Sequence, residues 1–310
     1  MRLTIYLTII TSLLAIALLR LLWLILRVRR QLKRARGFPV MSPSCQPAPR
    51  EWRNDQTTIA WLGHSTLLIN LRGKYILTDP VFSEIVGLHL PWGTKMGPRR
   101  LIHCPLEPEQ LPPLDLIVQS HAHMDHLDTA SWQRLPVGPA VVMAACNQRY
   151  IRRLGFAPIT ELEWGESSMA GGVQTTAVEV NHWGERFPWS RDHGYNAYLL
   201  ERDGVTILFG GDTAYTTAFR RARVGRKVHV AVLPIGGYQP YIRSHASPEQ
   251  AWQMFLELEA DYLIPIHHQT FVLSAEPPAE PLQRLLAIAG KAADKIVIRE
   301  VGATFEVPMG

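Results

Sequence analysis

Cysteine is scarce in this chain, and several familiar catalytic motifs are absent from it. The three cysteines, Cys45, Cys104 and Cys146, are widely spaced and odd in number, so they form neither a disulfide framework nor a C-x-x-C metal site. Free thiols in a reducing compartment, or one disulfide with one cysteine to spare, are the alternatives. The sequence also contains no G-x-S-x-G elbow, no Walker loop and no G-x-G-x-x-G fingerprint, which argues against serine hydrolases, P-loop nucleotidases and dinucleotide-binding enzymes.

Acidic residues are absent from the first 36 positions, which carry eight of the 32 lysines and arginines. The rest of the chain therefore holds 24 basic against 27 acidic side chains, and the net charge of +5 belongs to the N-terminal segment. A nucleic-acid-binding domain carries its positive charge on the folded body. We therefore expect no nucleic-acid partner.

An apolar run extends from Leu3 to Leu26 and is interrupted only by Arg20. Its length matches the ~20 apolar residues that cross a ~30 Å hydrocarbon layer, and the small-residue cleavage site of a secretory signal peptide does not follow it. A helix lying in the membrane plane is the alternative, but the apolar residues surround the whole helix. Six basic residues follow the run, so the positive-inside rule places the remainder of the chain in the cytoplasm.

These features predict a single-pass membrane protein with three segments. Residues 1–36 form the membrane anchor with its basic flank, residues 37–54 form a proline-rich spacer, and residues 55–310 form the catalytic domain. Proline-rich spacers are semi-rigid. The oligomeric state is left open.

The body of the chain alternates short apolar runs with turn signals, which indicates strands interleaved with helices. Strands are predicted at Thr57–Trp61, Thr66–Leu71, Lys74–Thr78, Leu114–Gln119, Ala140–Ala144, Val173–Val180, Ala197–Glu201, Thr206–Phe209, Val228–Leu233 and Tyr262–Pro265. Helices are predicted to begin at the N-cap residues Asp128, Thr216 and Ser247. This order predicts an α/β fold with helical layers around sheets.

Four metal-ligand side chains stand within six residues, in the segment His121-Ala122-His123-Met124-Asp125-His126. The segment directly follows a predicted strand, at the sheet edge where α/β proteins place their chemistry. A lone histidine is usually a surface or core residue, but such a cluster is not expected by chance among 12 histidines in 310 residues. The sequence therefore predicts a metal site here.

One loop cannot complete two coordination spheres, so further ligands must come from elsewhere in the chain. His182, Asp212 and His267 each follow a predicted strand and are candidates. The segments HAHMDH (121–126), GGDT (210–213) and IPIHHQTF (264–271), in this order, resemble the metallo-β-lactamase superfamily. The resemblance implies its αββα four-layer sandwich of two mixed sheets.

Further motifs are similar to the N-acyl-phosphatidylethanolamine phospholipase D branch of that superfamily. They are WLGHST (61–66), LTDPVF (77–82), NHW (181–183) and IGGY (235–238). The likeness covers roughly residues 55–275. One departure is that His268-Gln269 stands where the branch usually has Trp-Gly, which puts the shape of the pocket there in doubt.

The resemblance implies a ligand set. The first zinc would bind His121, His123 and His182, the second would bind Asp125, His126 and His267, and Asp212 would bridge the two. Nitrogen and carboxylate ligands without cysteine suit catalytic zinc, although manganese and iron accept the same donors.

Three residues are expected to take part in catalysis, namely Asp79, Asp125 and His245. By resemblance, Asp79 orients the nucleophilic water and His245 contacts the substrate or the hydroxide. A turn residue and a solvent-facing loop histidine are the respective alternatives. His64 is expected to be structural, hydrogen-bonded beneath the site.

Two cations that share a water lower its pKa towards ~7 and polarise the attacked group. The resemblance and the apolar segment together predict hydrolysis of a phosphodiester by a metal-bridging hydroxide, in N-acyl-phosphatidylethanolamine or a related phospholipid. A lactonase and a non-catalytic membrane adaptor are the alternatives. Five basic residues are candidates either for binding anionic headgroups or for a solvated helix face: Arg220, Arg221, Arg223, Arg226 and Lys227.

Overall fold

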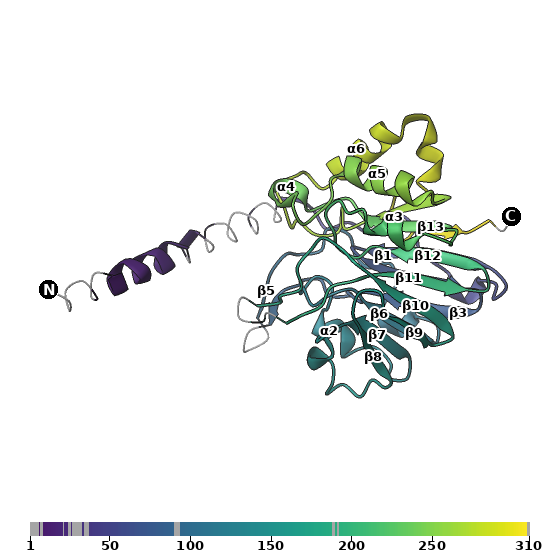
Figure 1. The fold of residues 1–310 in the computed structure, drawn as a ribbon, viewed down its shortest axis with the longest axis horizontal. Coiled ribbons are helices and arrows are strands. Elements are labelled where there is room, and N and C mark those ends of the chain that lie inside the picture. Colours follow the sequence, from purple (N-terminus) through teal and green to yellow (C-terminus); the bar gives the residue numbers. More distant parts are fainter. Residues whose placement is uncertain are drawn as a thin grey trace.

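Two β-sheets packed face to face form the centre of the molecule (Figure 1). The structure is a computed structural model that describes residues 6, 9–20, 22–23, 26, 33, 37–89, 94–187, 190 and 192–308. Strands and helices are interleaved along the chain. The predicted α/β class with two sheets is confirmed.

The first sheet has seven strands in the order β15-β1-β2-β3-β6-β7-β8. They are β1 (Thr57–Gly63), β2 (Thr66–Leu71), β3 (Lys74–Thr78), β6 (Leu116–Gln119), β7 (Ala140–Ala144), β8 (Ile159–Leu162) and β15 (Thr304–Glu306). Strands β15 to β3 pair antiparallel, and β3 to β8 pair parallel. Every residue of β1, β2 and β6 is buried, which explains why their sequences read as nearly continuous apolar runs.

The second sheet has six strands in the order β14-β13-β12-β11-β10-β9. They are β9 (Ser167–Ala170), β10 (Val173–Val178), β11 (Ala197–Arg202), β12 (Val205–Phe209), β13 (Val230–Pro234) and β14 (Tyr262–Ile266). The last three pair parallel, and the others pair antiparallel. A separate short hairpin joins β4 (Leu88–His89) to β5 (Lys95–Met96).

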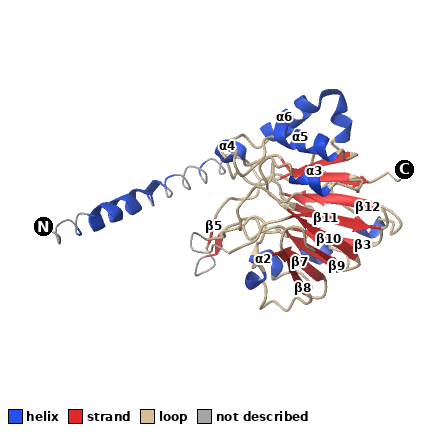
Figure 2. Ribbon diagram, in the orientation of Figure 1, coloured by secondary structure: helices blue, strands red, loops and turns tan. Residues whose placement is uncertain are grey.

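Helices cover the outer faces of both sheets, so the molecule has four layers (Figure 2). The helices of the second sheet are α3 (Ala218–Ala222), α5 (Pro248–Leu258) and α6 (Glu280–Ala289), while α2 (Thr129–Trp132) covers the first sheet. Phe255 packs with Leu199 of the second sheet, and Trp132 packs with Ile117 of the first. The central core between the sheets joins Ile59 to Ile207.

Helix α5 begins where its local sequence predicts. The Ser247 side chain accepts a hydrogen bond from the backbone N–H of Gln250, and the Gln250 side chain accepts one from the backbone N–H of Ser247. Pro248 occupies the first helical position. This reciprocal capping satisfies two N–H groups that a helix end leaves unpaired. The predicted start at Ser247 is confirmed, as is the start of α2 at Asp128, whereas α3 begins after Thr217, one residue later than predicted.

Several element ends differ from the prediction. Strand β6 begins at Leu116 and not at Leu114, and β10 ends at Val178 and not at Val180. The edge strands β8, β9 and β15 are not predicted at all, because they are three or four residues long and carry little apolar alternation. Edge strands need no second buried face, so their composition is weakly constrained.

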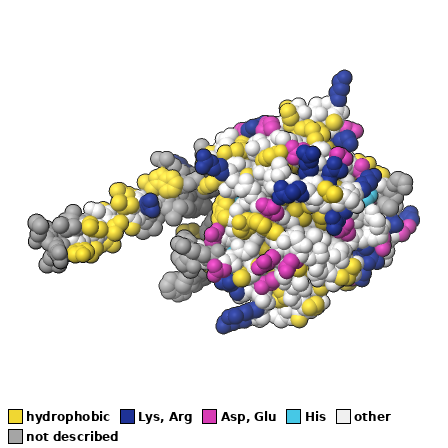
Figure 3. Space-filling model, viewed as in Figure 1, with side chains coloured by type: hydrophobic (Ala, Val, Ile, Leu, Met, Phe, Trp, Pro, Cys, Tyr) yellow, Lys and Arg dark blue, Asp and Glu magenta, His cyan; other side chains and the backbone are white. Residues whose placement is uncertain are grey.

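The predicted membrane segment lies partly outside the described residues. Residues 9–20 are helical, and their apolar side chains, such as Leu14 and Leu18, are exposed. Figure 3 shows this helix as a largely hydrophobic surface set apart from the body. Within the described part of the chain, no helix is both long and apolar enough to cross a membrane. The spanning helix therefore stays a prediction.

Residues 37–54, predicted to be a spacer, lie against the body. The backbone of Met41 donates to Leu101 at 2.8 Å and accepts from His103 at 2.9 Å. The Tyr75 hydroxyl donates to the carbonyl of Pro49 at 3.0 Å, and Pro49 is buried. The segment is thus held by backbone pairing and burial along the catalytic domain.

Candidate metal centre

The candidate ligands follow the carboxyl ends of strands from both sheets. The segment 121–126 follows β6, Asp212 follows β12, and His267 follows β14 directly. Parallel strands end at the same edge of a sheet, so residues far apart in the chain converge there. The structure brings all seven predicted ligands together at this edge.

The first group consists of His121, His123 and His182, with ligand nitrogens within 4.8 Å of one another. Nδ1 of His123 lies 2.9 Å from Nε2 of His121 and 3.3 Å from Nε2 of His182. The opposite nitrogens of two rings have protein partners: Nδ1 of His121 is 2.9 Å from the Ser120 hydroxyl, and Nδ1 of His182 is 2.9 Å from the Ser244 carbonyl. These contacts orient Nε2 of His121 and Nε2 of His182 towards Nδ1 of His123.

The predicted ligands of the second group are Asp125, His126 and His267, and His64 lies with them in the same cluster of possible metal-binding side chains. Nδ1 of His126 donates to Asp79 at 2.7 Å, and Nδ1 of His267 lies 3.3 Å from the Gly236 carbonyl, so both rings turn Nε2 inwards.

Asp212 lies between the two groups. Its Oδ2 is 3.1 Å from Nε2 of His126 and 3.1 Å from Nε2 of His267, and it is 3.8 Å from Nε2 of His182 in the first group. Gly211 makes this approach possible: it has a φ of +55°, and a Cβ there would lie 2.8 Å from the Ser120 side chain. Position 211 therefore requires glycine.

The centre contains buried polar atoms that lack a hydrogen-bond partner among the described residues. They are Nε2 of His126, Nε2 of His267, Oδ1 of Asp212 and Nδ1 of His245. Each such atom costs about 1–3 kcal/mol unless something satisfies it. Converging imidazole nitrogens and carboxylate oxygens are the donors that divalent cations such as zinc accept. The residues present fit two such cations, although the role of each as a ligand stays a prediction.

The first group is neutral at physiological pH. Burial lowers the pKa of His123 to about 4 and lowers the pKa values of His121 and His182 well below 6.5. Neighbouring histidines add to the effect for His121. The lone pairs of these rings are therefore available to a metal without loss of a proton.

The second group has the opposite tendency. Burial lowers the pKa values of His126 and His267, but the carboxylates of Asp212 and Asp125 outweigh it. They raise the pKa of His126 well above 6.5 and that of His267 to about 9. The same attraction holds the pKa values of both carboxyl groups well below their usual range despite their burial.

Asp79, predicted to orient the attacking water, lies behind His126. Its Oδ1 accepts from the Gln119 amide at 2.9 Å and from the Ser120 N–H at 2.7 Å. Its Oδ2 accepts from the Ser120 hydroxyl at 2.5 Å and from His126 at 2.7 Å. Both oxygens are thus occupied by protein donors, and Asp79 contacts the candidate ligands directly at His126 and, through the Ser120 hydroxyl, at His121. Its predicted role in orienting the water stays a prediction.

His245 lies beside the centre, 3.8 Å from Asp212. Burial lowers the pKa of His245 to about 4. Its ring packs on Gly237, which has a φ of +88° and where a Cβ would lie 2.9 Å from Nδ1 of His245. Trp183 is part of the same surface: its ring is 4.4 Å from His182 and 6.0 Å from His245, and it is 37% exposed. These two side chains form one wall of the centre.

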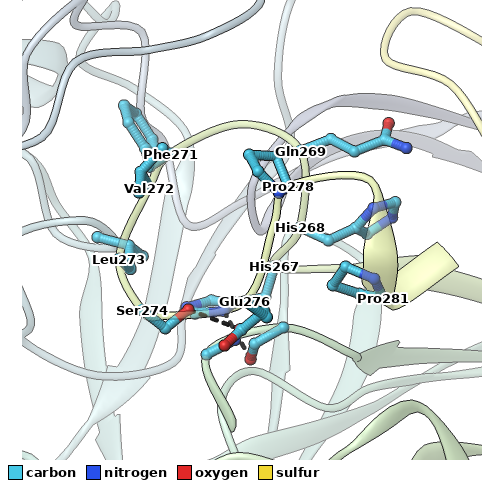
Figure 4. Close-up of a pocket in the computed structure, with 12 residues that line it drawn as sticks. His267, His268, Gln269, Phe271, Val272, Leu273, Ser274, Glu276, Pro278 and Pro281 are labelled. Atoms are coloured by element: carbon cyan, nitrogen blue, oxygen red, sulfur yellow. Dashed lines mark hydrogen bonds between the residues drawn. The ribbon is translucent and has the colours of Figure 1, made fainter. Parts of the chain in front are cut away.

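His268 does not face the metal groups. Figure 4 shows the rings of His267 and His268 pointing to opposite sides of the chain. The His268 ring stacks on Trp61 with centroids 4.7 Å apart and is buried, and burial lowers its pKa to about 3. The position that departs from the Trp-Gly pattern therefore lies behind the loop, against Trp61.

A cavity of about 20 Å³ adjoins His267, with Glu276 in its wall (Figure 4). Glu276 accepts hydrogen bonds from the backbone of Gly237 at 2.5 Å and from the Ser274 hydroxyl at 2.6 Å. The carboxylate therefore holds the loop that supports His245. No sequence signal identified Glu276, because its role depends on a contact between two loops.

Arg186 is a second residue that the sequence did not reveal. Its Nη1 donates to the carbonyls of Ala122 at 2.9 Å and Leu127 at 2.7 Å, and its guanidinium lies 5.0 Å from the Tyr150 ring centroid. These contacts close the ligand segment 121–126 into a turn. These contacts join Arg186 to residues far away in the chain, so the local sequence gives no sign of them.

The basic residues around α3 are mostly paired. Arg221 bonds Glu179 at 2.7 Å, Arg223 bonds Glu259 at 2.5 Å, Arg226 lies 3.2 Å from Glu201, and Lys227 lies 2.9 Å from Asp261. Neighbouring carboxylates reduce the attraction of such a face for anionic headgroups. The solvated helix face is the better description.

Comparison with known proteins agrees with this architecture and this site. Residues 74–268 match the family model of the beta-lactamase superfamily domain, and the chain belongs to this family. A possible metal-dependent hydrolase from Veillonella parvula DSM 2008 has a similar fold: TM-score 0.66 at 17% identity, covering 81% of this chain and 99% of that one. The protein is a metal-dependent hydrolase of the metallo-β-lactamase superfamily.

Sequence comparison also finds similar curated proteins. An uncharacterized protein of Mycobacterium tuberculosis is 31% identical over 257 residues, covering 78% of this chain and 67% of the relative. The mitochondrial N-acyl-phosphatidylethanolamine-hydrolyzing phospholipase D of Saccharomyces cerevisiae is 30% identical over 261 residues, covering 79% of this chain. This chain spans 54% of the yeast protein.

Proposed function

We propose that this protein hydrolyses a phosphodiester of N-acyl-phosphatidylethanolamine or a related phospholipid, in the manner of a phospholipase D. Two findings support the proposal: the geometry of the centre, and the similarity to the yeast enzyme with that activity. The observation that carries the metal-dependent part is the position of Asp212, whose Oδ2 lies within 4 Å of nitrogens from both ligand groups.

The ligand chemistry supports zinc, with manganese or iron as accepted substitutes. A pair of divalent cations would supply an activated water and neutralise charge on the reacting phosphate. His121, His123 and His182 would hold the first, and Asp125, His126 and His267 the second. Asp212 lies between the two groups and would contribute to both.

The chain's own residues then shape the access to this centre. Trp183 and His245 line one wall, and an exposed indole offers an apolar surface to the part of a lipid next to its phosphate. His245 has Nδ1 buried without a partner among the described residues, so this atom is available to hydrogen-bond a bound phosphate oxygen. Asp79 holds the ring of His126, and Glu276 holds the backbone of Gly237, on which His245 packs.

We also propose that the N-terminal apolar segment attaches the protein to a membrane, with the catalytic domain in the cytoplasm. The support is the sequence of residues 3–26 and the basic residues that follow. Fractionation with and without alkaline carbonate tests attachment, and protease protection tests orientation. Recovery of the full chain in the soluble fraction would end this part of the proposal.

The substrate is tested by measuring headgroup release from a panel of phospholipids in mixed micelles with the zinc-loaded full chain. Asp212→Asn removes a charge between the two ligand groups, and Asp294→Asn makes the same change at an exposed position in a 3-10 helix (Gly290–Lys295). We expect release by the wild type and by Asp294→Asn, and none by Asp212→Asn. Hydrolysis of a lactone but of no phospholipid would replace this proposal with the lactonase alternative.

A further inference from the structure

His64 stands outside the residues that match the family model, in the turn between β1 and β2, yet it reaches the centre. The residue is 1% exposed and has a φ of +54°. Left-handed backbone conformations account for only a few per cent of residues other than glycine, with asparagine, aspartate and histidine enriched among them, and they cluster at functional sites. The conformation aims the imidazole away from its own strands and towards the ligands.

The backbone of His64 is held on two sides. Its N–H donates to the Thr270 hydroxyl at 2.7 Å. Its carbonyl accepts from the Trp61 indole at 2.9 Å and from the backbone N–H of His267 at 3.0 Å. The ring position is therefore tied to the same loop that carries the ligand His267.

The imidazole itself contacts the second ligand group. Nε2 of His64 is 3.1 Å from Oδ2 of Asp125. The ring centroid is 4.2 Å from that of His267 and 4.9 Å from that of His126. The same Asp125 oxygen is 3.7 Å from Nε2 of His267, so it faces the metal position and His64 together.

We propose that His64 is a positioning residue that donates its Nε2–H to Asp125 and holds this carboxylate in place for the second cation. A carboxylate oxygen has two lone pairs, so one accepts from His64 while the other remains for the metal. Partners of this kind change metal affinity by about 10–100-fold when removed. The inference rests on the metal-dependent part of the proposed function and not on the phospholipid.

The test compares His64→Gln with His64→Met. The two side chains have similar length and shape and share the same backbone position, but only glutamine carries an N–H group. The readouts are the zinc dissociation constants of each group, measured by competition with a chelator, and the visible absorption of the cobalt-loaded protein. Thermal unfolding establishes that each variant is folded.

We expect His64→Met to weaken binding of the second cation by about 10–100-fold and to alter the cobalt spectrum. Binding of the first cation should be unchanged. His64→Gln should restore most of that affinity. Unchanged second-site affinity in His64→Met would overturn the proposal. Equal losses in both variants would also overturn it, because they would indicate that the imidazole nitrogen binds the metal directly.

A second measurement keeps the proposal testable if His64→Met is unstable. His64→Gln alone then carries the test: its cobalt absorption should match that of the parent, because no side chain that binds the metal has changed. A spectrum that shows the loss of a nitrogen ligand from the second cation would contradict action through Asp125. All these readouts are metal binding, so failure to find a phospholipid substrate leaves them interpretable.

Discussion

The two ligand groups differ in residue types and in their charge environment. The first group contains only histidines, and burial keeps them neutral, with the pKa of His123 at about 4. The second group contains Asp125 and faces Asp212, and these two carboxylates raise the pKa of His267 to about 9 in the protein without metal. A cation therefore enters the first group without competition from protons but must displace protons from the second. The difference teaches that carboxylates which attract a metal also attract the protons that compete with it.

The largest expected effect follows from removing the residue between the two groups. Asp212→Asn should lower the affinity of both groups and reduce activity by more than the ~100-fold typical of outer contacts, because Asp212 lies within 4 Å of nitrogens from both ligand groups. Metal content and turnover of Asp212→Asn and Asp294→Asn give the comparison. If Asp212→Asn retained two tightly bound cations, Asp212 would not lie between them in the loaded protein.

Asp79→Asn should lower the metal affinities of the two ligand groups to different extents. It removes the acceptor charge that orients His126 and should weaken binding of the second cation by about 10–100-fold. Binding of the first cation should weaken less, because Asp79 reaches His121 only through the Ser120 hydroxyl. Competition with chelators measures both constants. Equal weakening of the two cations would mean that Asp79 supports the whole edge of the sheet and not one ligand.

Gly237→Ala should disturb activity without removing metal. The added methyl group would lie 2.9 Å from Nδ1 of His245, and displacement of a site residue costs up to about a hundredfold in rate. Gly225→Ala is the matched control, because Gly225 has a φ of +76° and a methyl group there would meet no atom of the described residues within 4 Å. Both variants should lose about 1–2 kcal/mol of stability from left-handed strain. Equal activity of the two would exclude a role for the His245 position.

A smaller effect is the pH dependence of stability in the metal-free protein. His267 has a raised pKa, so its contribution is present below pH 6.5 and lost as pH rises towards about 9. His123 has a lowered pKa, so its contribution is present above pH 6.5 and lost as pH falls towards about 4. His267→Gln should flatten the alkaline loss and His123→Gln the acid loss, as seen in thermal unfolding across pH. If His267→Gln flattened the acid loss and His123→Gln the alkaline loss, the two groups would not differ in charge environment as described.

The sequence predicted the ligand segment and the strands before it because their signals are local. Four ligand types within 121–126 need no tertiary information, and long buried strands such as β2 keep their apolar pattern. Helix α5 was predicted from Ser247 and Pro248 for the same reason. Short edge strands such as β9 were not predicted, because pairing with a neighbour and not their own sequence makes them strands.

The supporting residues of the site were harder to predict, because each acts across loops. Asp79 stands before Pro80 and has the sequence of a turn, and only the fold shows that it bonds His126. His64 was expected to be structural, and its contact with Asp125 depends on a left-handed turn. Arg186 and Glu276 carry no local signal, since their partners are backbone groups of distant segments.

The most direct test of the two-group account is calorimetric titration of the metal-free full chain with zinc at neutral pH, in two buffers of different ionisation enthalpy. We predict two equivalents, with protons released on filling of the second group and fewer on filling of the first. A single equivalent, or the same proton release for both, would contradict the account.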